Sequence, residues 1–67
     1  MLDKKIIEEA VIIEVRKAST GCSPFEVRMR LEQQGWVRGD IRDAIARLLD
    51  YGSIKIDTNL RLHLFAE

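Results

Sequence analysis

The sequence predicts a mainly α-helical domain with a small β-hairpin, in the order α-α-α-β-β. Three observations support this fold class. Apolar residues recur at helical spacing in three segments, a glycine closes each segment, and alternating apolar and polar residues follow the last one. The 67 residues suffice for one domain and lie near the lower limit for a core without disulfides or metal ions. We therefore expect a single domain spanning 1–67.

The first helix is predicted over about 3–18, with Asp3 as its N-cap and Ser19-Thr20-Gly21 at its end. Its apolar residues form an arc wider than one facing helix would cover. The arc contains Leu2, Ile6, Ile7, Ala10, Val11, Ile13, Val15 and Ala18. We expect this helix to be the central support, packed against both later helices and the hairpin. Ile12 lies outside the arc, so we expect it to be exposed in a monomer or buried by a second chain.

The second helix is predicted over about 24–34, because Ser23-Pro24-Phe25-Glu26 is a capping box. Ser23 is expected to accept from the backbone N–H of Glu26, and the Glu26 side chain to accept from the N–H of Ser23. Gly35 is expected to end the helix in a left-handed conformation, and Trp36 to fold back on Leu31. The residues expected to point inward are Phe25, Val27, Met29 and Leu31.

The third helix is predicted over about 38–51 and the hairpin over about 54–65. The helix is expected to bury Ile41, Ala44, Ile45, Leu48 and Leu49 and to stop at Gly52. The hairpin alternates with period two, which predicts one buried face. That face would contain Ile54, Ile56, Leu60, Leu62 and Leu64. Asn59 is expected to provide the positive φ angle of the turn.

These features together resemble the winged helix-turn-helix superfamily. The resemblance covers 3–65 and rests on the capping segment Ser23-Pro24-Phe25-Glu26-Val27, the turn Gly35-Trp36-Val37, and the pattern I-x-x-A-I-x-x-L-L-x-x-G-x-I of residues 41–54. It indicates no particular family within the superfamily. What it implies is a module that binds double-stranded DNA, usually regulates transcription, and often works as a homodimer. The third helix would enter the major groove, and the hairpin, or wing, would lie near the minor groove or backbone.

The outer face of the third helix is where base reading is expected. Arg42 and Arg47 are the candidates, because arginine forms bidentate contacts with guanine edges, and the small Ala46 would permit close approach. Asp43 and Asp50 are spaced to pair with Arg47 on a solvated helix face, which is the competing interpretation. Candidates for DNA backbone contacts are Arg28, Arg30, Arg38, Lys55, Arg61 and His63. The hairpin tip at 57–59 lacks the arginine or lysine that favours minor-groove insertion.

Composition limits the other classes of function. Eleven basic and eleven acidic residues give a net charge of zero, so no long-range field attracts phosphate. This balance, with the aspartates of the third helix and with Ile12 and Phe65 as interface candidates, favours the alternative of an adaptor or inhibitor that binds a protein partner. One Cys22 and one His63 fall short of a metal site, and both are interpreted as structural or solvated rather than catalytic. We expect a cytoplasmic protein with no enzyme activity, cofactor, signal peptide or membrane span.

Overall fold

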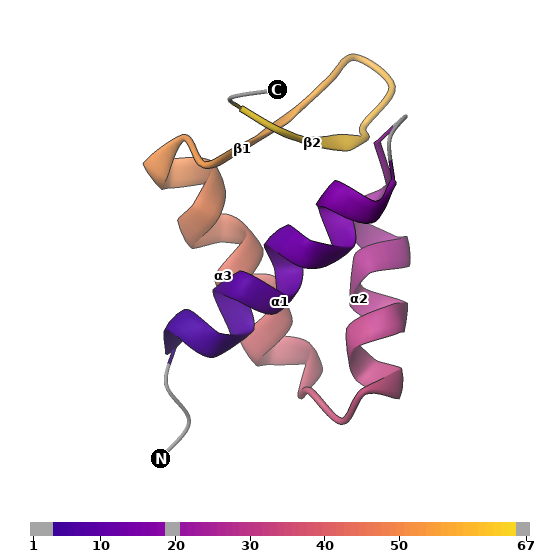
Figure 1. Ribbon diagram of the computed structural model, residues 1–67, viewed down its shortest axis with the longest axis vertical. Helices are drawn as coiled ribbons and strands as arrows, with labels where there is room; N and C mark the ends of the chain where they lie inside the picture. Colours follow the sequence, from indigo (N-terminus) through magenta and orange to yellow (C-terminus); the bar gives the residue numbers. More distant parts are fainter. Residues whose placement is uncertain (1–3, 19–20, 66–67) are drawn as a thin grey trace.

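The computed structural model describes residues 4–18 and 21–65 and contains three helices followed by an antiparallel hairpin (Figure 1). The helices are α1 (Lys4–Lys17), α2 (Pro24–Gln33) and α3 (Arg38–Tyr51), and the strands are β1 (Ile54–Ile56) and β2 (Leu62–Leu64). The predicted order α-α-α-β-β is therefore confirmed. The expected Asp3 cap, the arc position of Leu2, and Ser19 and Thr20 in the expected helix end lie outside the described residues.

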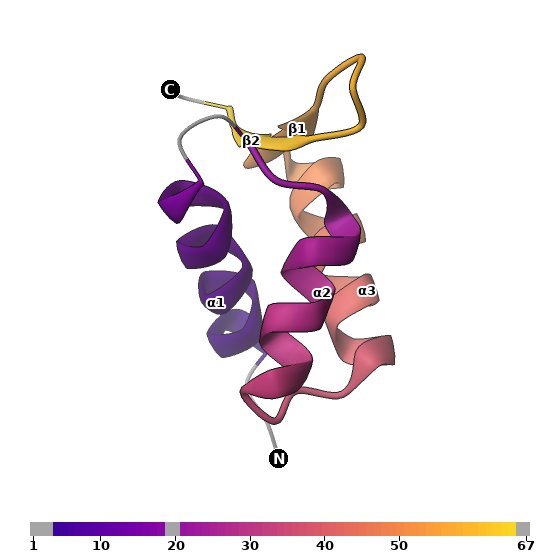
Figure 2. The ribbon, with the colours of Figure 1, turned by 90° about the vertical axis from the view of Figure 1, so that its right-hand side faces the viewer.

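Helix α1 supports the rest of the domain, as expected. It contacts α2, α3 and strand β2, while α2 and α3 also contact each other. Helices α2 and α3 diverge from the short turn that joins them, and the hairpin crosses the opposite end of the molecule (Figure 1). Figure 2 shows α1 on one side of the domain and α3 on the other, with the loop of the hairpin extending over the α3 side. Two faces result, one formed by α1 and one by α2, α3 and the hairpin loop.

The core forms where the three helices and the hairpin meet. Its apolar residues are Ile7, Val11, Val15, Cys22, Val27, Leu31, Ile41, Ala44, Ile45, Leu48, Ile54 and Leu62. In the described part of the chain, no helix has the length and the apolar character that a membrane span requires.

The predicted buried arc of α1 was wrong at three positions. Ile6 and Ile13 are exposed, whereas Ile12 is half-buried and packs against the core. Ile12 lies one turn after Glu8, and Glu8 contacts Arg47 of α3, so α3 covers this side of α1. Ile6 and Ile13 lie seven positions apart on the opposite edge of the arc. The interface expectation for Ile12 therefore loses its basis, because this side chain is covered within the domain.

The start and the end of α2 follow the expected capping pattern. The backbone N–H of Glu26 donates to Ser23 Oγ at 3.1 Å, and the Trp36 N–H donates to the carbonyl of Leu31 at 3.0 Å. Gly35 has a φ of +102°, as expected for a left-handed helix stop. The Glu26 carboxylate differs in detail, because it accepts from the Ser23 hydroxyl at 3.4 Å, where the sequence predicted a bond from the Ser23 backbone N–H.

The inward face of α2 is narrower than predicted. Val27 and Leu31 are buried, but Phe25 is 57% exposed and Met29 is 42% exposed. Val27 and Leu31 are spaced i, i+4 and form a single stripe, which is enough for a ten-residue helix packed at an angle to its neighbours. Phe25 lies beside this stripe, and its ring centroid is 5.0 Å from the guanidinium carbon of Arg28.

Helix α3 ends at Gly52, whose φ of +77° is left-handed as predicted. Four of its five expected core residues are buried, and Leu49 is the exception at the exposed edge. In the hairpin, Ile54 pairs with Leu64, Lys55 with His63 and Ile56 with Leu62.

The expectation of one continuous buried face on the hairpin was wrong at its tip. Ile54 and Leu62 are buried and Leu64 is half-buried, but Ile56 and Leu60 are exposed because the tip extends beyond the helices. The positive φ angle is at Leu60 (+61°) and not at Asn59. Residues 57–60 form a turn closed by the Leu60 N–H and the Asp57 carbonyl. In three-residue hairpin loops of this kind the left-handed residue follows the turn, which places it at Leu60.

Candidate nucleic-acid interface

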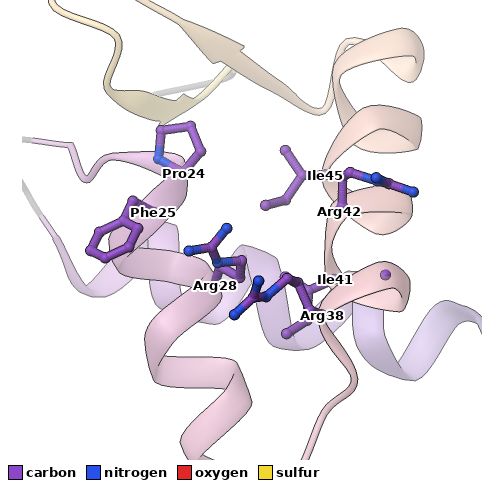
Figure 3. A pocket seen from close by; sticks show the side chains of 8 residues that line it. Pro24, Phe25, Arg28, Arg38, Ile41, Arg42 and Ile45 are labelled. Atoms are coloured by element: carbon purple, nitrogen blue, oxygen red, sulfur yellow. The ribbon is translucent and has the colours of Figure 1, made fainter.

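Helices α2 and α3 enclose a groove of about 550 Å³ on the face opposite α1 (Figure 3). The groove lies between the N-terminal half of α2 and the N-terminal half of α3. The two helices diverge from the turn at 34–37, which leaves room between them. Ile45 points across the groove toward α2, and the guanidinium groups of Arg28 and Arg38 extend into the gap from the two sides (Figure 3). The residues lining it are Pro24, Phe25, Arg28, Arg38, Gly39, Ile41, Arg42 and Ile45.

A single carboxylate holds two of the groove arginines. Arg28 Nε lies 3.5 Å from Glu32 Oε1, and Arg38 Nε lies 3.5 Å from Glu32 Oε2. Arg28 Nε is enclosed and has no hydrogen-bond partner within residues 4–18 and 21–65, so its contact with Glu32 is ionic. The Arg28 guanidinium also lies over the ring of Phe25, which fixes its position further. Glu32 was not singled out from the sequence, although its i, i+4 spacing from Arg28 is a usable signal.

Arg38 and Arg42 are both highly accessible on this face. Their side chains are 67% and 80% exposed, and they occupy the first two turns of α3. Arg42 Nε lies 3.7 Å from Asp43 Oδ1, a surface ion pair that contributes little to stability. Ala46 is exposed one turn further along α3. The structure therefore places two sequence-predicted candidates, Arg42 and Ala46, on an open helix face.

Arg47 is in a different situation. Its Nε donates to Glu8 Oε2 of α1 at 2.7 Å, and its side chain is 26% exposed. The hydrogen bond to Glu8 raises the pKa of the Arg47 guanidinium. The expected partners on the same helix, Asp43 and Asp50, are not the ones it binds in a hydrogen bond. Arg47 thus ties α3 to α1, and no local spacing in the sequence reveals a contact that spans 39 positions.

Arg30 is also directed toward α1. Its Nη1 lies 3.8 Å from Glu14 Oε1, and its Nη2 lies 3.9 Å from Glu26 Oε2. Glu14 is buried and also accepts from Gln34 Nε2 at 3.2 Å. The sequence contained a signal for this, because Glu14 follows Ile7 by seven positions and Val11 by three and so shares the core-facing side of α1. Glu14 was missed because its charge suggested an exposed position.

The hairpin residues form a network with the loop before α2. Arg61 Nη1 donates to the carbonyl of Gly21 at 3.0 Å, and His63 Nε2 lies 2.7 Å from Asp57 Oδ2. The prediction of a solvated His63 without a partner was therefore wrong. The reason is the strand register. Lys55 pairs with His63, and Asp57 follows Lys55 by two positions, so Asp57 and His63 are diagonal neighbours on the same face of the hairpin. Lys55, which pairs with His63 in the strand register, is exposed on the outer face of the hairpin.

Asp57 organises the loop of the hairpin. Its Oδ1 accepts from the backbone N–H of Arg61 at 2.9 Å and of Asn59 at 2.8 Å. These backbone bonds, that of Arg61 above all, and the side-chain contact with His63 lower the pKa of Asp57. The ionised form of Asp57 is the one that stabilises the loop.

We expect the hairpin to lose stability in acid through Asp57. A lowered pKa in the folded state stabilises the fold above the unfolded-state pKa, about 3.9 for aspartate, and this contribution is lost as pH falls through the folded value. Urea unfolding of wild type and Asp57→Asn at a series of pH values tests this. The difference between the two unfolding free energies should be largest near neutral pH and shrink below about pH 4. A difference that stays constant down to pH 2 would contradict the role of the ionised carboxylate.

Cys22 is part of the core and not of a reactive site. Its backbone pairs with that of Leu62 through two hydrogen bonds, of 3.3 and 2.7 Å, which connect the loop before α2 to strand β2. Burial raises the pKa of the Cys22 thiol, so the reactive thiolate is disfavoured. No group of three or more histidine, cysteine or acidic side chains in the described parts of the chain is arranged to hold a metal ion.

Exposed apolar side chains occur on the α1 face and at the hairpin. Ile6 and Ile13 lie on one edge of α1 with the half-buried Ala10 between them. Phe65 is exposed after strand β2, and its N–H donates to the carbonyl of Ser53 at 3.2 Å. Of the two interface candidates taken from the sequence, Phe65 is accessible.

The six predicted backbone candidates and the two base-reading arginines thus separate into groups. Arg28, Arg38 and Arg42 line one groove, whereas Arg30 and Arg47 are bound toward α1 and Arg61 is bound to the Gly21 loop. Comparison of the chain with protein-family models, curated proteins and solved structures found no match.

Proposed function

We propose that this chain is a winged-helix domain that binds double-stranded DNA with the face formed by α2, α3 and the hairpin loop. The observation that carries the proposal is that Arg28, Arg38 and Arg42 all line one groove beside the N-terminal half of α3. The guanidinium groups of Arg28 and Arg38 extend into the groove, and that of Arg42 points outward from α3 (Figure 3). In helix-turn-helix proteins the N-terminal residues of the second helix of the motif contact base edges. Here that helix would be α3, and its first two turns carry Arg38 and Arg42.

The residues have different roles in this proposal. Arg42, which is the most exposed of the three arginines, reads bases, and Ala46 allows α3 to approach the groove closely. Arg38 and Arg28, whose guanidinium groups are held by Glu32, contact phosphates and fix the register of the helix. Lys55 adds a phosphate contact from the hairpin. Arg47 retains a structural role because Glu8 already binds it.

A net charge of zero affects how such a domain would work. One copy neutralises few phosphates, so its affinity falls with added salt along a shallow slope. A homodimer doubles the contacts and compensates for weak binding by one copy. The proposed biological role is transcription regulation at paired half-sites, which is the arrangement that two-fold symmetric binders require.

We expect Arg38→Ala/Arg42→Ala to weaken DNA binding by about tenfold or more, because one lost bidentate base contact already costs about 1–3 kcal/mol. Duplexes are first selected from a random-sequence pool with the wild-type protein, and affinities are then measured by fluorescence anisotropy. The control is Arg16→Ala, an exposed arginine on α1 and so on the opposite face. The control should bind within about twofold of wild type, as surface substitutions away from a contact do.

Equal affinities of wild type, the double variant and the control would remove the proposed role of α3. That result would favour the alternative, an adaptor that binds a protein partner. The observation that supports an adaptor is the pair of exposed isoleucines, Ile6 and Ile13, on the face opposite the arginines. An adaptor of this kind would show only weak duplex binding that the arginine substitutions leave unchanged.

A further inference from the structure

The groove between α2 and α3 has a chemical character that DNA phosphate alone does not explain. On the α3 side the groove is lined by Ile45, which is 9% exposed, and by the completely buried Ile41, and on the α2 side by Pro24 and Phe25. Phosphate groups are strongly hydrated and gain nothing from contact with such surfaces. A ligand that uses the whole groove must therefore have an apolar part as well as a negative charge.

The charged residues around the groove determine the sign and the size of the charge that a ligand should carry. Arg28 and Arg38 stand against the single carboxylate of Glu32, which leaves an excess of one positive charge at the groove. Arg42 points outward from α3 and is paired with Asp43. The guanidinium groups of Arg28 and Arg38 extend into the gap from opposite helices (Figure 3). Guanidinium groups bind carboxylates through paired hydrogen bonds, so a singly charged carboxylate matches these residues.

The volume limits the ligand further. About 550 Å³ falls within the range of about 300–1,000 Å³ that is typical of small-molecule sites. The Phe25 ring is 57% exposed and the Arg28 guanidinium lies over it, so a flat aromatic body has a ring and a planar guanidinium to lie against.

We infer that this groove is a binding site for a small organic carboxylate with a flat apolar body. The carboxylate binds the terminal Nη groups of Arg28 and Arg38, since Glu32 contacts the Nε atoms of both. The apolar body rests on Ile45 and Pro24 beside Phe25. The groove opens on the face that we propose for DNA, so the bound carboxylate blocks the approach of phosphate. The site follows from the lining of the groove, whereas this regulation by competition rests on the proposed function.

Direct binding is tested with 2-naphthoate as the probe, observed through the methyl NMR signals of Ile41 and Ile45. We expect saturable shifts of both signals, with a dissociation constant of about 1 mM or below. The matched compound 2-naphthamide has the same body without the charge and should bind to the wild type at least about tenfold more weakly. The variants Arg28→Gln and Arg38→Gln should bind 2-naphthoate at least about tenfold more weakly than the wild type does. The variant Arg16→Gln is the control and should bind 2-naphthoate as wild type does. Inorganic phosphate should leave the two methyl signals unmoved.

Three results would overturn the inference. They are unmoved methyl signals with 2-naphthoate, equal binding of 2-naphthamide, and equal shifts with phosphate. Circular dichroism of the arginine variants checks that they remain folded, so that a loss of binding reports on the groove.

A second arm separates the site from the proposed function. If both hold, 2-naphthoate should release the selected duplex at the concentrations that saturate the methyl shifts. Saturable naphthoate binding without release of a bound duplex supports the site and contradicts the proposed DNA face. Arginine-dependent duplex binding without any naphthoate shifts supports the DNA face and overturns the site.

Discussion

Leu31→Ala should remove a large part of the stability of the domain. Leu31 is completely buried on α2, and its carbonyl also accepts the N–H groups of Gln34 and Trp36 that close the helix. Truncation of a buried leucine to alanine costs about 2–5 kcal/mol. A chain of this size has a total stability of about 3–10 kcal/mol at roughly 0.05–0.15 kcal/mol per residue, so the loss removes a large part of it.

Urea denaturation followed by circular dichroism measures this effect. Met29→Ala is the matched control, because Met29 is on the same helix two positions earlier and is 42% exposed. We expect the control to lose about 1 kcal/mol or less, in proportion to the smaller area it buries. If Met29→Ala destabilised the protein as much as Leu31→Ala, the packing of α2 described above would be wrong.

Gly21→Ala should also be strongly destabilising, by about 2–4 kcal/mol, from backbone strain and overpacking together. Gly21 has a φ of +87°, which strains any other residue, and an added Cβ would lie 2.5 Å from His63 Cε1. The imidazole would have to move away, which breaks its contact with Asp57. The loop before α2 would then lose its close packing against the hairpin.

Gly35→Ala separates the two causes. Gly35 also has a positive φ, +102°, but an added Cβ there meets no described atom within 4 Å. Thermal unfolding should therefore rank wild type above Gly35→Ala and Gly35→Ala above Gly21→Ala. In a His63→Ala background the cost of Gly21→Ala should fall toward that of Gly35→Ala. An unchanged cost in that background would show that His63 does not restrain Gly21.

The element order was predictable because local signals define it. The Ser23 cap, the glycines at 35 and 52 and the alternating hairpin each act within a few residues. The breadth of the buried faces was not predictable in the same way. Periodicity shows which side of a helix is apolar, but the angle at which the neighbouring helices cross it decides how much of that side is buried. Ile12 became covered because α3 lies along its side of α1, and Met29 remained exposed because no described element covers its side of α2.

The same distinction between local signals and tertiary packing applies to the candidate site. The exposure of Arg42 and Ala46 follows from their place on α3 opposite the core residues, and the sequence predicts it. The pairing of Arg47 with Glu8, and of Arg38 with Glu32, joins different helices and depends on the tertiary arrangement. The groove itself arises from the angle between α2 and α3, which no single segment encodes. Sequence patterns therefore identified which arginines are exposed, but not which residues from different helices come together.

The central claim is that the face formed by α2, α3 and the hairpin loop binds double-stranded DNA, and NMR mapping with a selected duplex tests it most directly. We expect the amide signals of residues 38–46, with that of Arg28 and those around Lys55, to shift as duplex is added. The signals on the outer side of α1, including those of Glu9 and Arg16, should remain in place. Shifts concentrated on the outer side of α1, or no shifts with duplex in excess, would contradict the claim.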